Sequence, residues 1–247
     1  EIGDWMRLTL NPGRPDEQVL LDMEFFDRAS APQGDEGEIY RVSAFLRHEV
    51  TEDAAGYLEQ LLARAPSPSP VPWSDLANAQ IKLGRFDDAI AVIEKELLPA
   101  DYPGARAMLG SALLLDGQNE RAIEVLGQAT AENPTNAASW YNLGLAYSMQ
   151  QLPAHAESAL RKAVTLEPLL ERGWYYLALA LQQLERDEEA MAALRKSLAV
   201  TPSFHRPYKT LVELLLSAGQ RDEARRYLLR GMKNIEEPAF LESVRLE

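Results

Sequence analysis

A period of 34 residues runs through the middle and the C-terminal part of this sequence and constrains its fold more than any other feature. Proline, an aromatic residue, leucine and small residues each recur at this step and in a common register. The series are Pro134, Pro168 and Pro202; Trp140, Trp174 and Tyr208; Leu109, Leu143, Leu177 and Leu211; Gly110, Gly144, Ala178 and Val212; and Ala122, Ala156, Ala190 and Ala224. One more copy, with Trp73, Leu76, Ala77, Gly84 and Ala89, lies 33 residues before its successor. Several series in one register indicate a repeat architecture.

The spacing inside one copy predicts a helical hairpin. Its first half places apolar residues at i, i+3, i+4 and i+7, one face of a helix: Trp140, Leu143, Gly144 and Tyr147. Its second half places Ala156, Leu160 and Ala163 on a matching face, and Pro168 ends that helix. The small residues at 144 and 156 let the two backbones approach closely. Such a hairpin cannot bury its own apolar stripe, so it needs a neighbouring hairpin.

The series W-x-x-L-G-x-x-Y, then A-x-x-x-L-x-x-A, then P, resembles the tetratricopeptide repeat. The resemblance covers five copies over residues 70–236, with Arg106, Val212 and Gln80 as departures from the pattern. It implies an all-α fold, a right-handed α-solenoid of stacked antiparallel helical hairpins.

The segments outside the repeats show weaker patterns. Residues 1–35 are an N-terminal arm that could form two strands, or a helix opening at Asp16. Residues 36–66 predict a degenerate hairpin, with Thr51 capping its second helix and with inward faces formed by Ile39, Val42, Ser43 and Leu46, and by Ala54, Leu58 and Leu61. Residues 67–72 predict an extended Pro/Ser linker. Five repeats would then fill 73–236, and 237–247 would form a C-terminal capping helix after Pro238.

Charge and composition limit the classes of partner molecule that we expect this chain to bind. The formal net charge is −13, which disfavours nucleic acid and anionic lipid. No apolar run has the length of a membrane span, so we expect no direct membrane insertion by this chain. The absence of cysteine excludes disulfides and thiolate metal sites. The chain begins at Glu1 without a targeting segment, so we expect any such segment to have been removed; periplasmic, extracytoplasmic and cytoplasmic locations all stay open.

The sequence predicts no enzyme, no metal and no cofactor. His48, His155 and His205 fall in separate hairpins, without a second ligand at helical spacing. Acidic residues recur with the repeat: Asp87, Asp88, Glu120, Asp187, Glu188, Glu189, Asp222 and Glu223. Each falls in the first turn of a second helix, where free amide groups favour negative charge, so a helix-terminus role is expected instead of paired catalytic carboxylates.

The face of each first helix that points away from its buried stripe is the expected binding face. Positions two residues beyond the aromatic, and three and seven beyond that, are turned from it by about 140° to 200°. In the first copy, these positions include Asp75 and Asn78. In the middle copies, the residues at these positions are mostly apolar or aromatic. We predict a peptide-binding groove lined by Asn78, Met108, Ser111, Tyr141, Asn142, Leu145, Met149, Arg172, Tyr175, Tyr176, Leu179, Arg206 and Lys209. The alternative is that these residues only contact one another in a tightly wound superhelix.

The resemblance implies that the concave surface holds an extended peptide or a helix of another protein. Asn78 and Asn142 match asparagines of the chaperone-binding subclass, but Ser74 replaces its lysine, so that clamp is incomplete. Our hypothesis is a non-enzymatic adaptor whose partner is a protein, including one with acidic groups. The alternatives are a structural subunit docked through its N-terminal arm, or the targeting region of a larger enzyme. Self-association is a further option, because the basic residues Arg225, Arg226, Arg230 and Lys233 could meet the acidic N-terminal third.

Overall fold

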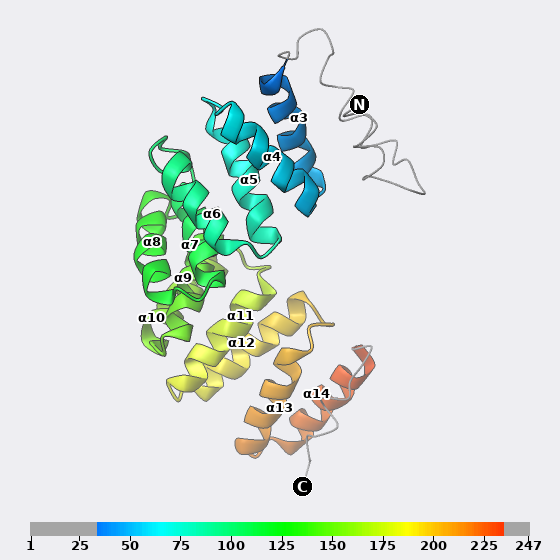
Figure 1. Ribbon diagram of the computed structural model, residues 1–247. Helices are drawn as coiled ribbons and strands as arrows, with labels where there is room; N and C mark the ends of the chain where they lie inside the picture. The colour runs from blue at the N-terminus through cyan, green and yellow to red at the C-terminus, as the bar shows by residue number, and fades with distance from the viewer. Residues whose placement is uncertain (1–33, 235–247) are drawn as a thin grey trace. The chain divides into compact units, whose positions relative to one another are not determined.

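The computed structural model describes residues 34–234, and within them every regular element is a helix (Figure 1). The helices fall into two compact units, which divide between Ala100 and Asp101. The predicted all-α fold of stacked helical hairpins is confirmed. The predicted arm, apart from its last two residues, and the predicted C-terminal capping helix lie outside the described residues.

From residue 34 to residue 100, the first unit contains two hairpins. They comprise α3 (Asp35–His48), α4 (Glu52–Arg64), α5 (Pro70–Lys82), α6 (Phe86–Val92) and a single π-helical turn, η1 (Ile93–Leu97), that continues α6. The hydroxyl of Thr51 accepts a hydrogen bond from the Ala54 amide at 3.2 Å and so caps α4. The predicted inward residues of both helices are buried, among them Ile39 and Val42 of α3 and Leu58 and Leu61 of α4.

The extended linker predicted over residues 67–72 ends earlier, because α5 begins at Pro70. Ser69 is the N-cap, and its hydroxyl accepts a hydrogen bond from the Val71 amide at 3.3 Å. Proline suits this place because its fixed φ is helical and the first-turn amide it lacks would have no helical partner. The arm boundary also shifts by one residue, since Asp35 already belongs to α3.

As far as residue 234, the second unit is a row of four hairpins. They are α7 (Ala105–Leu115) with α8 (Asn119–Glu132), α9 (Ala137–Met149) with α10 (Pro153–Leu166), α11 (Glu171–Gln183) with α12 (Asp187–Val200), and α13 (Arg206–Ser217) with α14 (Arg221–Asn234). Figure 1 shows each hairpin beside its successor, as the repeat requires. The recurring acidic residues lie in the first turns of α6, α8, α12 and α14, so the helix-terminus interpretation of their position is confirmed.

A hydrogen bond explains why proline and the aromatic residue recur together, six positions apart. The indole Nε1 of Trp140 donates to the carbonyl oxygen of Pro134 at 2.9 Å. Trp174 donates in the same way to Pro168 at 2.9 Å, and the Tyr208 hydroxyl donates to Pro202 at 3.0 Å. The aromatic residue therefore fastens each first helix to the turn that precedes it.

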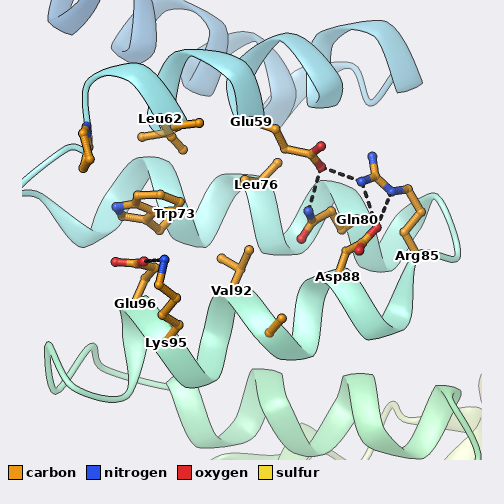
Figure 2. A pocket seen from close by; sticks show the side chains of 13 residues that line it. Glu59, Leu62, Trp73, Leu76, Gln80, Arg85, Asp88, Val92, Lys95 and Glu96 are labelled. Carbon is orange, nitrogen blue, oxygen red and sulfur yellow. Dashed lines mark hydrogen bonds and ion pairs between the residues drawn. The ribbon is translucent and has the colours of Figure 1, made fainter.

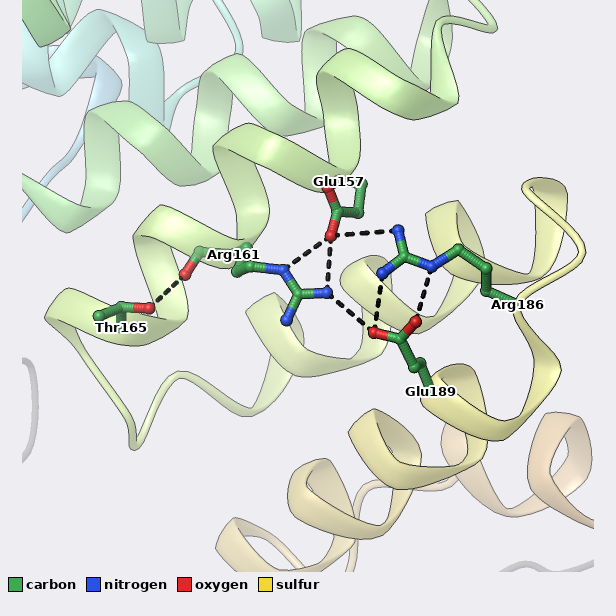
Figure 3. A network of polar contacts seen from close by, with 5 residues as sticks. All are labelled: Glu157, Arg161, Thr165, Arg186 and Glu189. Atoms are coloured by element: carbon green, nitrogen blue, oxygen red, sulfur yellow. Dashed lines mark hydrogen bonds and ion pairs between the residues drawn. The ribbon is translucent and has the colours of Figure 1, made fainter.

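Ion pairs on the second helices join consecutive hairpins (Figure 3). Glu157 and Arg161 of α10 face Arg186, the N-cap of α12, and Glu189 of α12. Arg161 lies 3.3 Å from Glu189, and Arg186 lies 3.6 Å from Glu157 and 2.7 Å from Glu189. Because three of these four side chains are 41–49% exposed, each pair contributes roughly 0 to 1 kcal/mol, and their main effect is to favour one register between neighbours.

Candidate peptide-binding surface

All but one of the predicted groove residues lie on the first helices of the second unit. Met108 and Ser111 are on α7; Tyr141, Asn142, Leu145 and Met149 on α9; Arg172, Tyr175, Tyr176 and Leu179 on α11; Arg206 and Lys209 on α13. Asn78 is exposed on α5 of the first unit and is considered by itself. We call the set in the second unit the first-helix surface.

Some of these residues contact one another across neighbouring helices. The side-chain amide of Asn142 donates to the Ser111 hydroxyl at 2.8 Å, and the rings of Tyr141 and Tyr176 meet edge to face at 6.1 Å. For these four residues, the alternative to a groove applies: they contact one another and help to join α7, α9 and α11.

The sequence predicted that Asp75 lies on the open face of α5, and this prediction was wrong. It is 9% exposed and accepts hydrogen bonds from the Ser43 hydroxyl and from Arg47 of α3, the latter at 2.8 Å from Nε. The helical angle alone placed Asp75 away from the buried stripe, but α3 packs on that side of α5. The carboxylate thus joins two first helices of the first unit.

Four aromatic side chains form a continuous tract on the first-helix surface. Edge-to-face contacts link Tyr141 to Tyr176, Tyr176 to Tyr175 at 5.3 Å, and Tyr175 to Phe204 at 5.5 Å. All four are half-buried. Burial, assisted by the neighbouring Tyr176, raises the pKa of Tyr141 to about 12, so its hydroxyl is neutral at physiological pH. The tract offers rigid rings with polar tips, a composition suited to contacts with a peptide.

A pocket of about 390 Å³ opens at the end of this tract, between the start of α11 and the turn before α13. It is lined by Glu171, Arg172, Tyr176, Thr201, Ser203, Phe204, His205 and Arg206. Arg172 has a side chain 69% exposed and lies 4.0 Å from the Glu171 carboxylate, while Arg206 is exposed on the opposite hairpin. The pocket therefore combines two guanidinium groups and the Glu171 carboxylate with the hydroxyls of Tyr176, Thr201 and Ser203 and the rings of Tyr176, Phe204 and His205.

The turn residues of this pocket were not among the predicted groove residues. Thr201, Ser203, Phe204 and His205 precede α13, outside the helical positions from which the groove was predicted. One signal was available in the sequence, because Phe204 stands where the two preceding copies carry Asn136 and Leu170. An aromatic residue at that turn position reaches Tyr175 of the preceding hairpin.

The first-helix surface also carries apolar side chains in contact with solvent. Met149 is 61% exposed, while Met108, Leu145 and Leu179 are half-buried. Leu115 of α7, outside the predicted set, is 57% exposed. Lys209 lies on α13 at 4.0 Å from Glu213. Exposed apolar groups beside charged ones are typical of interaction surfaces.

The three histidines belong to three different hairpins. His155 packs against the Tyr147 ring at 5.1 Å, His205 lies 6.1 Å from the Phe204 ring, and His48 is exposed in the last turn of α3. Within residues 34–234, no three histidine or acidic side chains gather as metal ligands would. In the same range, no helix combines the length and the apolar character needed to cross a bilayer.

Solved structures with similar folds are forms of the protein MamA. A crystal structure of MamA is 28% identical in sequence and superposes with a TM-score of 0.60, covering 64% of this chain and 93% of that one. MamA of Desulfovibrio magneticus RS-1, from its residue 41 onward, is 26% identical with a TM-score of 0.62, covering 70% of this chain and 98% of that one. Comparison with curated protein sequences gave no significant match.

The family comparison covers most of the sequence. Residues 37–245 match the family described as the C-terminal domain of cilia and flagella-associated protein 70, a tetratricopeptide-repeat domain. The match includes the degenerate hairpin of α3 and α4 as well as the five regular copies. Neither this description nor the names of the solved structures include a catalytic activity. The chain therefore belongs to the tetratricopeptide-repeat family of the cilia and flagella-associated protein 70 C-terminal domain.

Proposed function

We propose that this protein is a non-enzymatic adaptor that holds a segment of a partner protein on the first-helix surface of its second unit. The tetratricopeptide-repeat fold is itself typical of protein interaction scaffolds. The proposal goes further by assigning the partner segment to one surface and by naming its chemistry. That segment is an extended peptide or a helix with an acidic group next to an apolar or aromatic side chain.

The pocket between Arg172 and Arg206 carries this proposal. Each guanidinium group can donate two parallel hydrogen bonds to a carboxylate, and consecutive hairpins supply one each. Tyr176 and Phe204 line the same pocket and can pack against the adjacent side chain of the partner. Since each desolvated aromatic or arginine anchor contributes roughly 1 to 4 kcal/mol, a few such contacts support a stable complex.

The exposed methionine and leucine residues extend the surface beyond this pocket. Met149 and Leu115 are the most exposed apolar side chains of α9 and α7, and methionine adapts its shape to different partners. In this proposal, the partner's acidic group enters the pocket and its apolar residues continue along α9 towards α7. Arg172 and Arg206 add positive charge at this pocket to a chain that is acidic as a whole, which favours an acidic segment there.

The test compares charge reversals on two surfaces. Wild-type protein and the variants Arg172→Glu, Arg206→Glu and Arg225→Glu serve as baits in native extract, with bound proteins quantified by mass spectrometry. Arg225 is exposed on α14 and makes a matched control, because its reversal changes the net charge equally. Partners retained by wild type and by Arg225→Glu, but lost with the other two variants, are expected.

A purified partner is then titrated by calorimetry against these variants and Tyr176→Ala. We expect each pocket variant to weaken binding by about tenfold or more, equivalent to roughly 1.4 kcal/mol. Affinity that is equal for wild type, Arg172→Glu, Arg206→Glu and Tyr176→Ala would reject this surface as the binding site.

A further inference from the structure

The first unit has a pocket of its own, with a volume of about 540 Å³, between the second helices α4 and α6 and over α5 (Figure 2). From α5 it is lined by Trp73, Leu76 and Gln80. Asn78, the predicted groove residue of this helix, is turned from Leu76 and Gln80 by about 200°. The pocket therefore lies on the side of α5 away from the predicted groove, and it is a separate site.

Gln80 is the unusual residue of this pocket. The equivalent positions of the later copies carry Leu113, Tyr147, Leu181 and Leu215, all apolar or aromatic. Gln80 is 2% exposed, and its side-chain nitrogen donates to a carboxylate oxygen of Glu59 at 2.8 Å. Its carbonyl oxygen Oε1 is buried and has no hydrogen-bond partner among residues 34–234. A buried acceptor without a donor is unfavourable, so a ligand that supplies a donor would be bound preferentially.

The charges at this end of the pocket favour a cationic donor. Arg85 lies 2.7 Å from Glu59, 2.8 Å from Asp88 and 3.1 Å from Glu52, so one cation stands among three carboxylates. Burial lowers the pKa of Arg85, but its bond to Asp88 and the charge of Glu59 outweigh burial and raise that pKa overall. The group keeps a surplus of negative charge beside the unpaired oxygen of Gln80, and Figure 2 shows these side chains converging there.

The opposite end of the pocket is apolar and has a fixed shape. The indole of Trp73 donates to the Ser67 carbonyl oxygen at 3.2 Å, which holds the ring in place beside Leu62 and Val92 (Figure 2). The π-helical turn η1 then brings Lys95 and Glu96 to the rim, where they pair at 3.1 Å. Because these two charges neutralise each other, the negative surplus stays at the Gln80 end.

We propose that this pocket binds an arginine side chain of a partner polypeptide. The aliphatic stem packs along the indole of Trp73, and the guanidinium reaches the other end of the pocket, where it donates to Oε1 of Gln80 and to the carboxylate of Asp88. Arginine fits better than lysine because its planar guanidinium offers several donors at once, so it can bond to Gln80 and Asp88 together. This site takes the opposite charge to the Arg172 and Arg206 pocket, and it does not depend on the function proposed above.

The test follows the full chain, labelled with ¹⁵N, during titration with the capped peptide acetyl-Gly-Arg-Gly-amide. We expect saturable shifts of the Trp73 indole NH and the Gln80 side-chain amide. The matched peptide with citrulline in place of arginine has the same shape without the charge, and it should bind at least about tenfold more weakly. Saturable binding of the citrulline or the lysine peptide at the same affinity would overturn the assignment.

Substitutions in the pocket test whether the arginine peptide binds there. Gln80→Leu introduces the side chain that three later copies carry, so it should fold, and it should weaken binding of the arginine peptide at least about tenfold. Asp88→Asn should weaken binding severalfold, whereas Asp87→Asn, on the adjacent exposed residue outside the pocket, should leave it unchanged. Equal affinity for wild type and Asp88→Asn, or shifts that persist in a folded Gln80→Leu, would overturn the proposal. Arg172→Glu should leave this binding intact, which separates its outcome from that of the first-helix surface.

Discussion

Gly144 of α9 lies so close to Leu160 of α10 that a Cβ atom added to the glycine would be 2.5 Å from Cγ of the leucine and 3.3 Å from its backbone nitrogen. Gly110 stands in the same relation to Leu126, one period earlier. The small residue of the repeat is therefore set by the distance between the two helices of one hairpin. The next two copies, with Ala178 and Val212, show that this requirement is met differently along the row.

Gly144→Ala should destabilise the protein by about 1 to 3 kcal/mol, because the added methyl group must displace Leu160 in a packed interface. Urea unfolding measures the change. Gly127→Ala is the matched control in α8: nothing lies within 4 Å of its added Cβ, so alanine should stabilise the helix by about 0.5 to 1 kcal/mol. Equal stability changes in the two variants would contradict the close approach of α9 and α10.

Tyr208→Phe should destabilise the protein by about 1 to 3 kcal/mol. The ring is fully buried, and its hydroxyl donates to the Pro202 carbonyl oxygen and accepts from the Asn234 side chain at 3.1 Å. Phenylalanine keeps the packing and leaves both partners without this bond. Thermal and urea unfolding measure the loss of stability. Tyr227→Phe is the control, because the Tyr227 hydroxyl has no hydrogen bond within residues 34–234. Its removal should change stability by less than about 0.5 kcal/mol.

Asp75→Asn should weaken the junction of α3 and α5. The substitution keeps an acceptor for the Ser43 hydroxyl but removes the charge that attracts Arg47, whose Nη2 lies 2.8 Å from the carboxylate. We expect a loss of about 1 to 2 kcal/mol in urea unfolding. Asp87→Asn is the control, because it removes an equal charge from an exposed first-turn position. An equally large loss of unfolding free energy in that variant would assign the effect to net charge instead of this contact.

Stability should fall between pH 10 and 12 through Tyr141. Burial and Tyr176 raise its pKa from 10.0 to about 12 in the folded protein, so the folded state binds the phenolic proton more tightly than the unfolded state does. The contribution is complete below pH 10, where both states are protonated, and it is lost as the pH rises through 12. Tyr141→Phe should therefore show a smaller loss of stability over this range in urea unfolding at stepped pH. A spectrophotometric titration counts the tyrosines that ionise late. The same number of late-ionising tyrosines in wild type and in Tyr141→Phe would contradict the assignment.

The repeat, the helix faces and several helix caps could be read from the residues, because they depend on neighbours within one hairpin. Thr51 caps α4 as predicted, and the acidic residues at 87, 88 and 120 occupy first helical turns. The start of α5 could not be placed as well, since Pro70 and Pro72 are compatible with both an extended segment and a first helical turn.

The candidate site was predicted in part. Arg172, Tyr175, Tyr176 and Arg206 do meet around one tract and pocket, but Phe204 joins them from a turn that no helical pattern describes. Angles around a single helix give the direction of a side chain and not the distance to the next helix. For that reason they could not distinguish exposed Met149 from Asn142, which is bonded to Ser111.

By itself, the sequence determined that this chain is a row of helical hairpins, because the 34-residue period repeats the same local helix pattern and the same need for an apolar neighbour. Only the tertiary structure decided which polar and aromatic residues remain available to a partner. It turned Asp75 towards Ser43 and left Oε1 of Gln80, a residue that lines a pocket of the first unit, without a hydrogen-bond partner among residues 34–234. The physical reason is that a pocket is the space that neighbouring helices leave unfilled, and its size depends on side chains from segments distant in sequence.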